Sequence, residues 1–380
     1  MTLLDQSCQF WKCKPDEVMP FDAEDVFNPP NRLEGFQCRI GDHRYGALYI
    51  TAVNAIPCAP QVVWGTPKQH YPFDKQGNFH WLPCRKVNLY TKLDGTNILA
   101  YTYEFKGKEF ITYKTRMTPI VRTSTFADFV AMWHEMLERY PRIPELVFET
   151  GLNLSFELYG SRNIHLIVYD VPLETRLLFG ITRTIEPRIV DPEDIRVPQL
   201  PSPICFRADG FVCPTLKDLT SYYKKIQAEA EAMNEKTEVG IKGTEGYVLY
   251  YHLEDGTVKQ FKCKPDTIER IHWSSGGVNK NVLRATVMNA YESESEVTVE
   301  VVKKLLLEEF QPQEVERWHY KIVEVIEEVK EEMVFRKKVK AVYASIGKNI
   351  AEDKREVMRE MSKHFPKNKM SYVYWVIANT

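Results

Sequence analysis

The sequence predicts an α+β protein in which an antiparallel-sheet domain comes first and an all-α C-terminal domain follows. Up to about residue 275, short segments rich in Val, Ile, Tyr, Phe and Thr alternate with turns, and no part has the alternating strand and helix pattern of a parallel sheet. From about residue 281, apolar residues recur at helical spacing instead. A chain of 380 residues can form more than one domain. We therefore expect a sheet-based domain over 1–275 and a helical domain over 281–380.

The strands of the first domain are predicted where β-branched and aromatic residues dominate. One such strand runs from Val87 to Leu93. Seven others, in chain order, are RYGALYITAV (44–53), NILAYTYEF (97–105), KEFITYKT (108–115), LSFELYG (154–160), NIHLIVYDV (163–171), GYVLYYHLE (246–254) and TVKQFKCK (257–264).

Two helices are expected between these strands. The first covers 124–140, where Ser124 or Thr125 would cap a helix with apolar residues at helical spacing. The second covers 216–238. Between the two helices, prolines recur over 185–206, which predicts an extended surface connection without a chemical role.

The helical domain is predicted from two apolar stripes and ends in a basic segment. The stripes are Val299, Val302, Leu306 and Phe310, then Ile322, Val325, Ile326, Val329 and Met333. The basic residues are Arg336, Lys337, Lys338, Lys340, Lys363, Lys367 and Lys369, with aromatic residues nearby. Charge runs of this kind are usually solvated helix faces, and an RNA contact is the other interpretation. The stripes would pack against each other or form a homodimer with a second copy of the chain.

Composition bounds the function. Charged residues make up 27% of the chain and the net charge is −2, which indicates a globular protein and argues against non-specific coating of nucleic acid, although a local basic groove is compatible with it. There is no stretch of eighteen apolar residues and no signal-like N-terminus, so we expect a cytoplasmic protein that does not bind membranes. Of the eight cysteines, Cys8 and Cys13 would at most join a metal site, and reduced thiols are the favoured interpretation.

The segment YTKLDGTN, residues 90–97, places a lysine between a predicted strand and a turn-forming Asp-Gly pair. In a structural interpretation, Lys92 is a solvated strand residue and Asp94-Gly95 closes a tight hairpin. In a functional interpretation, Lys92 is a nucleophile, Asp94 lies beside it, and Gly95 lets a ligand approach the backbone. The segment alone favours the structural interpretation, so the decision depends on the rest of the chain.

Other charged residues in the predicted strands favour the functional interpretation. Glu157 and Glu245 lie within or next to apolar strands, where an unpaired charge is costly unless it meets a metal, a hydroxyl or a cation. Two basic pairs, Lys114 with Arg116 and Lys262 with Lys264, are spaced so that both members share a strand face. Basic pairs on strands suit a polyanionic ligand.

Five segments, taken in their order along the chain, resemble the motifs of the covalent nucleotidyltransferases. This is the superfamily of ATP-dependent ligases and RNA capping enzymes. KLDG (92–95) resembles motif I, FELYG (156–160) motif III and LIVYD (166–170) motif IIIa. EGYV (245–248) resembles motif IV and FKCK (261–264) motif V. The sequences of these segments are most similar to those of the phage-type RNA ligase 1 family, and the resemblance spans about residues 30 to 270. Arg44, Lys68 and Arg116 look like further nucleotide-binding residues of that family.

The resemblance implies an ATP-dependent RNA ligase with an antiparallel-sheet nucleotidyltransferase domain. Lys92 would attack the α-phosphate of ATP and carry AMP, which passes to an RNA 5′-phosphate before a 3′-hydroxyl end displaces it. Glu157 would contact the ribose side of the nucleotide, Glu245 the metal, and Lys262 and Lys264 the phosphates, while Asp94 would serve the later steps. The expected metal is Mg²⁺ or Mn²⁺, held by oxygen ligands. The expected partner is RNA with 5′-phosphate and 3′-hydroxyl ends.

Three alternatives remain at this point. A DNA ligase or a capping guanylyltransferase would share Lys92 and the strand carboxylates, but both usually continue into an oligonucleotide-binding β-barrel, whereas helices are predicted here. A catalytically inactive RNA-binding module would be expected to carry a damaged motif, and none is damaged. The sequence does not name the RNA, because recognition of RNA by shape leaves little local signature.

Overall fold

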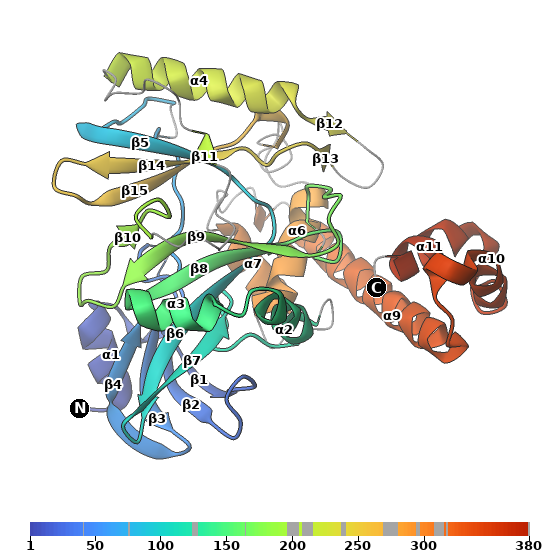
Figure 1. Cartoon of the computed structure of the whole chain (residues 1–380), viewed down its shortest axis with the longest axis horizontal. Helices are drawn as coiled ribbons and strands as arrows, with labels where there is room; N and C mark the ends of the chain where they lie inside the picture. Colours follow the sequence, from blue (N-terminus) through green and yellow to red (C-terminus); the bar gives the residue numbers. More distant parts are fainter. Residues whose placement is uncertain are drawn as a thin grey trace. The chain divides into compact units, whose positions relative to one another are not determined.

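The computed structural model of the protein describes residues 1–40, 42–74, 77–123, 128–163, 165–195, 205–206, 216–236, 241–268, 280–293, 297–307, 315–316 and 318–378. The chain divides into two compact units (Figure 1). One comprises Met1–Tyr169 and Leu173–Arg270, and the other comprises Asp170–Pro172 and Ile271–Thr380. Antiparallel sheets make up the first unit and helices the second, which confirms the predicted α+β class.

The first sheet and the N-terminal helix precede the candidate site. Helix α1 (Leu3–Trp11) begins at Thr2, whose hydroxyl accepts a hydrogen bond from the Asp5 amide. The 3₁₀ helix η1 (Pro15–Glu17) leads into the antiparallel sheet β1 (Val18–Glu24), β2 (Arg32–Cys38), β3 (Leu48–Val53) and β4 (Ile56–Val63). Trp11 is buried, with its ring 5.8 Å from that of Tyr49, and so joins α1 to β3.

Two further antiparallel sheets carry the candidate site. The five-stranded sheet has the order β10 (Ile189–Val190), β9 (Glu174–Thr182), β8 (Leu152–Tyr159), β6 (Thr96–Phe105) and β7 (Lys108–Lys114). The four-stranded sheet has the order β11 (Cys205–Phe206), β5 (Cys84–Thr91), β14 (Tyr247–Leu253) and β15 (Val258–Cys263). The pair β12 (Glu235–Lys236) and β13 (Ile241–Lys242) stands apart from both.

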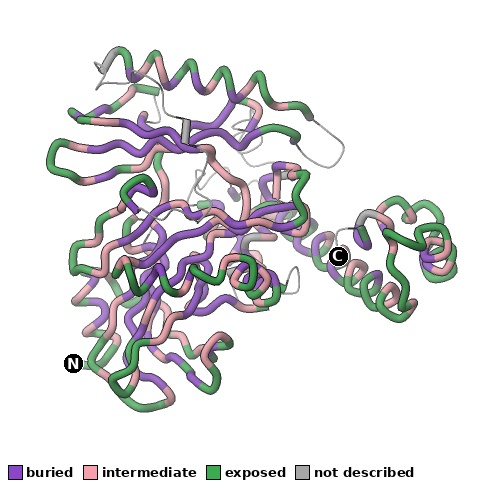
Figure 2. The backbone as a smooth tube through the Cα atoms, viewed as in Figure 1, coloured by how far each residue is buried: buried purple, intermediate pink, exposed green. Residues whose placement is uncertain are grey.

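Helices of the first unit cover outer faces of these sheets (Figure 1). Helices α2 (Phe129–Arg139) and α3 (Ile143–Thr150) pack on the five-stranded sheet, where Trp133 is buried among Ile98 and Phe156. Helix α4 (Leu216–Ala232) lies along the four-stranded sheet, and its Tyr223 is buried beside Tyr251. The inner strands β8, β6, β5 and β14 are accordingly buried along most of their length, while turns and outer helix faces are exposed (Figure 2).

The structure differs from the sequence-based expectations at three places. The segment 163–171 forms no strand, since the structure has only isolated bridges at Asn163 and Ile167 in the part it describes. Strand β5 ends at Thr91, and β6 joins a different sheet, so Asp94-Gly95 is not a hairpin turn. Helix α2 begins at Asp128, whose carboxylate accepts from the Ala131 amide, whereas the predicted caps, Ser124 and Thr125, lie outside the described residues.

The proline-rich segment is more than a surface connection where it is described. Its residues Ile189 and Val190 pair with β9, and Asp191 is fully buried. The Asp191 carboxylate accepts hydrogen bonds from Tyr90 on β5 and from Asn88, 2.9 Å away, and lies 2.8 Å from the His252 ring nitrogen on β14. The segment therefore connects the five-stranded and four-stranded sheets through a buried carboxylate.

The second unit is helical. It contains α6 (Lys280–Ser293), α7 (Val299–Leu307), α9 (His319–Ile346), α10 (Ile350–Met361), η3 (Lys367–Lys369) and α11 (Met370–Ala378). All five predicted stripe residues of α9, from Ile322 to Met333, are buried, while Phe310 lies outside the described residues. Glu332 accepts from Arg336 and Tyr372 and so joins α9 to α11. None of the helices in the described ranges combines the length and apolar character needed to cross a membrane.

Candidate active site

Lys92 lies immediately after β5, at the end of the four-stranded sheet. Its backbone amide donates to the carbonyl of Gly246, 2.8 Å away, which continues the pairing of β5 with β14 by one residue. Its Nζ lies 2.5 Å from Oε2 of Glu245, and its side chain keeps 20% of its surface exposed. The lysine is thus held in place by an ion pair while part of it stays open to a ligand.

Glu245 binds two lysines with its two carboxylate oxygens. Oε1 lies 2.8 Å from Nζ of Lys264, and Oε2 takes Lys92. The Glu245 side chain is 6% exposed. Burial by itself would raise the pKa of this carboxyl, but the neighbouring charges of Lys264 and Lys92 outweigh burial and lower the pKa to about 2. Glu245 is therefore ionised at neutral pH.

Strand register explains why these three residues meet. Tyr247 pairs with Thr91 on one side and with Cys263 on the other, so the residues that flank this row lie at one end of the sheet. Gly246 allows its own backbone to approach that of Cys263 closely. Its φ is +125°, and a Cβ there would lie 2.1 Å from the carbonyl oxygen of Cys263. The Glu-Gly pair is thus required by packing as well as by charge.

Asp94 and Gly95 connect Lys92 to the five-stranded sheet. The amide of Gly95 donates to Oε1 of Glu157, 3.0 Å away. A Cβ on Gly95 would lie 2.2 Å from the carbonyl oxygen of Leu158, so the neighbouring strand β8 requires glycine here. Burial raises the pKa of Glu157 to about 7, against the opposing charge of Lys92.

The carboxylate of Asp94 binds backbone amides from the segment that was predicted as a strand. Its Oδ2 accepts from Leu166 and Ile167, at 2.7 and 2.8 Å. These amides therefore donate to the Asp94 carboxylate instead of pairing with a neighbouring strand, which explains why the described part of 163–171 forms no strand. The Asp94 amide in turn donates to the Tyr169 hydroxyl, 2.8 Å away. Burial, together with the charge of Glu245, raises the pKa of Asp94.

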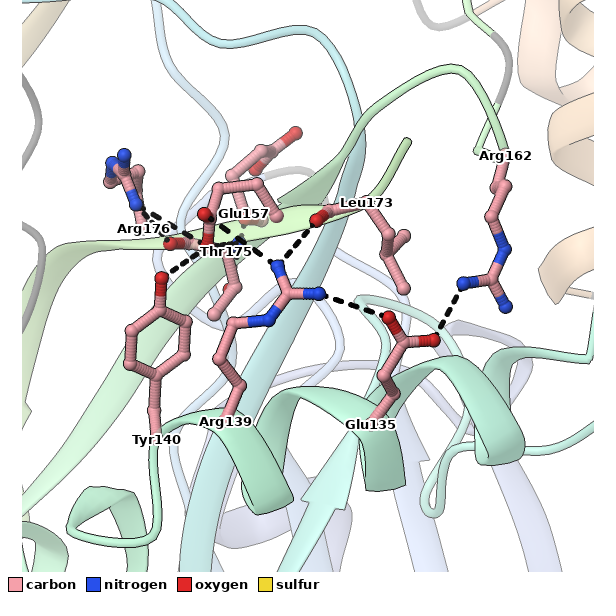
Figure 3. Close-up of polar contacts among 9 residues, drawn as sticks. Glu135, Arg139, Tyr140, Glu157, Arg162, Leu173, Thr175 and Arg176 are labelled. Carbon is pink, nitrogen blue, oxygen red and sulfur yellow. Dashed lines mark hydrogen bonds and ion pairs between the residues drawn. The ribbon is translucent and has the colours of Figure 1, made fainter. Parts of the chain in front are cut away.

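A network of arginines and carboxylates fixes β8 and β9 behind Glu157 (Figure 3). Arg139 and Arg162 both bind Glu135 on α2, and Arg139 also donates to the carbonyl of Leu173, 2.8 Å away. The Thr175 hydroxyl donates to the backbone carbonyl of Glu157 itself, at 3.0 Å. Helix α2 thereby positions the strand that presents Glu157.

The basic pair at the end of β7 differs from its prediction. Lys114 is fully buried, and its Nζ donates to the carbonyls of Thr115 and Arg116, at 2.7 and 3.0 Å. It does not share an exposed strand face with Arg116. The Arg116 charge is close enough to Glu157 to act on its pKa, and the Arg116 Nε is buried without a hydrogen-bond partner among the described residues.

Three other predicted residues lie apart from the Lys92–Glu245–Lys264 group. The Lys262 ammonium packs over the ring of Tyr71, 4.3 Å from its centroid. Lys68 lines a separate cavity along β15. Arg44 binds Asp42, with Nη2 2.6 Å from Oδ2, and also donates to the carbonyl of Trp11.

Sequence reasoning missed the residues that complete the environment of Asp94. The His165 Nε2 lies 3.4 Å from the Thr96 hydroxyl, and Asn163 donates to the Leu158 carbonyl at 2.6 Å. A polar cluster in an apparent strand, Asn163 and His165 at alternate positions, was the available signal. The hydroxyl of Tyr169 was within the motif IIIa match but had no assigned role.

The residues present suit a metal that also binds phosphates. In the part of the chain that the structure describes, no group of three or more His, Cys, Asp or Glu side chains could enclose a metal ion. Glu245, whose charge acts on the pKa of both Asp94 and Glu157, forms with them a group that offers oxygen ligands only. Mg²⁺ is commonly bound by one or two carboxylates together with phosphate oxygens and water, so this donor set fits it. Cys8 and Cys13 are free thiols.

Comparisons with known proteins give low similarities. No family model and no curated protein matches the chain. Among solved structures, an archaeal ATP-dependent RNA ligase is 15% identical with a TM-score of 0.46, and the match covers 96% of this chain and 90% of that one. A putative ATP-dependent DNA ligase from Aquifex aeolicus is 13% identical with a TM-score of 0.40, over 96% and 88% of the two chains. A variant RNA ligase of Naegleria gruberi, solved with AMP and Mn, is 16% identical with a TM-score of 0.34, over 50% and 53%. At these values the chemistry has to be argued from the side chains of the site.

Proposed function

We propose that this protein is a covalent nucleotidyltransferase, and specifically an ATP-dependent RNA ligase of the phage type. The observation that carries the proposal is the convergence of Lys92, Glu245 and Lys264 at one end of a sheet, beside Glu157. A lysine used only for stability would not need a partly exposed ammonium on a buried carboxylate that also pairs with a second, buried lysine. The residues in their order along the chain also resemble the motifs of this superfamily.

In the proposed reaction, the neutral amine of Lys92 attacks the α-phosphorus of ATP. A P–N bond forms, the bond to pyrophosphate breaks, and the amine proton is released. An oxygen of an RNA 5′-phosphate then displaces the lysine, which regains a proton. Finally a 3′-hydroxyl attacks that 5′-phosphate, so that AMP leaves and a phosphodiester bond joins the ends.

Each neighbouring residue has a proposed part in this sequence. Before attack, Lys92 has to leave its ion pair with Glu245, because a protonated amine has no lone pair. Lys264 is held next to the same carboxylate and would neutralise charge on the transferring phosphoryl group. Glu157, anchored by the Gly95 amide, would bind the ribose side of the nucleotide. Glu245 would hold Mg²⁺ or Mn²⁺, which when bound offsets the charge of the phosphates.

The deciding experiment is the intact mass of the purified protein after incubation with ATP, GTP or NAD, each with Mg²⁺. We expect an AMP adduct from ATP alone, and none in Lys92→Ala. A GMP adduct would indicate a capping guanylyltransferase. Failure to form any adduct, after removal of copurified nucleotide, would contradict nucleotidyl transfer and leave an RNA-binding module as the better interpretation. Joining of 5′-phosphorylated RNA compared with DNA then separates an RNA ligase from a DNA ligase.

A further inference from the structure

A second cavity in the first unit lies along β15, away from Lys92. Its volume is about 630 Å³, which is within the range of small-ligand sites. Residues 257–261 of β15 and its preceding turn form one wall, and the segment from Pro67 to Asp74 forms another. Lys92, Asp94, Glu157, Glu245 and Lys264 are not among its lining residues.

Strand register relates the cavity to the candidate active site. Cys263 is level with Thr91 across β14, next to Lys92, whereas Val258 at the other end of β15 lines the cavity. The part of β15 that lines the cavity runs from Phe261 to Val258, which at about 3.3 Å per residue lies about 7 to 16 Å from the level of Cys263. Lys262 lies between them, over the ring of Tyr71 in the cavity wall. A chain that leaves Lys92 along β15 therefore reaches the cavity after a few nucleotide units.

The floor of the cavity is apolar and partly aromatic. Tyr71 and Phe73 stack with ring centroids 5.0 Å apart and an interplanar angle of 26°. The other apolar lining residues include Leu82, Ile181, Ile189 and Phe261. The Lys262 ammonium lies over the Tyr71 ring, which also stacks on Phe73, so a nucleobase would contact the aliphatic lining residues and the ring edges.

The rim of the cavity is cationic. Arg188 and Lys259 are both exposed and both close enough to Asp255 to act on its pKa, which places them near each other. The two acids of the lining are already engaged, Asp42 by Arg44 at 2.6 Å and Asp74 by His80 at 3.1 Å. The exposed Asp255, which accepts from the Thr257 amide, lies close to both cations, so a phosphate has to compete with this carboxylate for them.

A buried amide in the cavity wall also indicates a polar ligand. The Nε2 of Gln260 has no hydrogen-bond partner among the described residues, and Gln260 lines the cavity. Buried donors are rarely left without an acceptor in folded proteins, so a base carbonyl or a phosphate oxygen would complete this one.

We propose that this cavity binds one nucleotide of a single-stranded polynucleotide that extends from the site of Lys92. The base lies on the apolar lining of the cavity, and the phosphate lies at Arg188 and Lys259. This inference rests on the proposed function, since it assigns a position to the strand being joined. Lys68, which resembles a nucleotide-binding residue, is a half-buried third cation of the lining, so the triphosphate of ATP is the competing ligand and its binding is one outcome of the test.

The test uses the full chain with Arg188→Ala and Lys259→Ala combined. The matched control combines Lys106→Ala and Lys108→Ala, which removes two exposed charges at the β6–β7 turn of the same unit. The probes are ATP with Mg²⁺, followed by intact mass, and a fluorescent single-stranded RNA with a 5′-phosphate, followed by anisotropy over a series of salt concentrations. A thermal melt confirms that both variants fold.

We expect the cavity variant to form the AMP adduct at the same ATP concentrations as the unaltered protein and the control. Its affinity for the RNA should fall about tenfold, and the slope of log affinity against log salt should become shallower by about 0.7 for the one lost phosphate contact. Unchanged RNA affinity and slope would overturn the inference. A raised ATP requirement with unchanged RNA affinity would also overturn it and assign the cavity to the triphosphate.

Failure of the proposed function is distinguished by a different readout. It would appear as absence of an AMP adduct in the unaltered protein, whereas the anisotropy comparison depends only on RNA binding and stays decisive. A second variant, Gln260→Met, removes the unpaired amide while keeping side-chain volume. It should weaken RNA binding without changing the salt slope, and an effect on slope alone would contradict the assigned contact.

Discussion

Lys92 and Glu245 form an ion pair of 2.5 Å although 153 residues separate them in the chain. The pair joins the end of β5 to the start of β14, and Lys264 on the other side of the carboxylate extends it to the end of β15. A buried carboxylate shared by two lysines costs desolvation energy that well-packed apolar residues would avoid. Its retention at a strand end is therefore explained better by chemistry than by stability.

Replacement of Glu245 by glutamine tests this interpretation. The change leaves Lys264 buried without its counter-charge, so the free energy of unfolding should fall by about 3 kcal/mol. AMP-adduct formation should slow by about 100-fold, because the group that orients Lys92 and would hold the metal is lost. Urea unfolding and intact mass measure the two effects. Glu138→Gln, on the exposed face of α2, is the control, and an equal effect of both changes would refute a special role of Glu245.

The raised pKa of Glu157 predicts a stability that depends on pH. Burial brings this pKa to about 7 in the folded protein, above the usual glutamate value of 4.5. Between these values the folded protein holds a proton that the unfolded chain has lost, so stability falls as pH rises through this window. The difference of about 2.5 units corresponds to about 3 kcal/mol.

Glu157→Gln removes this titration. Compared with the variant, the unaltered protein should lose about 3 kcal/mol of unfolding free energy between pH 4.5 and pH 8. Urea denaturation at several pH values in that range measures it. Parallel curves for the two proteins would show that Glu157 is solvated as an ordinary carboxylate.

Site residues could be predicted from the sequence where a charged side chain lies next to a clear strand pattern in the same segment. Glu245-Gly246 and Lys264 lie next to strands that are apolar and strongly β-prone, and register alone then brings their neighbours level with Lys92. Such pairing follows from local propensity and alternation. The α+β class was predictable for the same reason.

Long-range polar contacts were not predictable in the same way. The segment 163–171 has the composition of a strand, but Asp94 takes the amides of Leu166 and Ile167, and nothing near those residues signals a carboxylate that lies over seventy positions earlier. Asp191 is a second example of an unpredicted long-range contact, since its buried partners Tyr90 and His252 come from two distant strands. Tertiary contacts of this kind override local propensity.

The close approach of strand β8 to Gly95 predicts that any side chain at this position would clash. Gly95→Ala would place a Cβ 2.2 Å from the carbonyl oxygen of Leu158, and relief of the clash would pull the Gly95 amide away from Glu157. We expect loss of the AMP adduct and a fall of about 2 kcal/mol or more in unfolding free energy. Gly107→Ala is the control, because its Cβ meets open space and only its φ of +73° is unfavourable, for about 1 kcal/mol. Equal losses at the two positions would contradict the close approach of β8.

Lys114 provides a pH prediction of the opposite sign. Burial, with a further contribution from Arg116, lowers the pKa of this lysine to about 7, against the usual lysine value of 10.5. Between these values the unfolded chain binds a proton that the folded protein lacks, so stability is lost as pH falls from 10.5 towards 7. Lys114→Met removes the titration but also the hydrogen bonds to the carbonyls of Thr115 and Arg116.

The quantity to measure is therefore how the difference in unfolding free energy between the two proteins changes with pH. The lost hydrogen bonds contribute equally at each pH and do not affect that change. From pH 7.5 to pH 9.5, the unaltered protein should gain about 1.4 kcal/mol per pH unit of unfolding free energy relative to Lys114→Met. Lys108→Met, an exposed lysine on the same strand, should leave the pH dependence unchanged. If the Lys114 variant and the unaltered protein kept a constant difference over this range, Lys114 would have to be charged in the fold, and the carbonyls of Thr115 and Arg116 would then be compensating a buried cation.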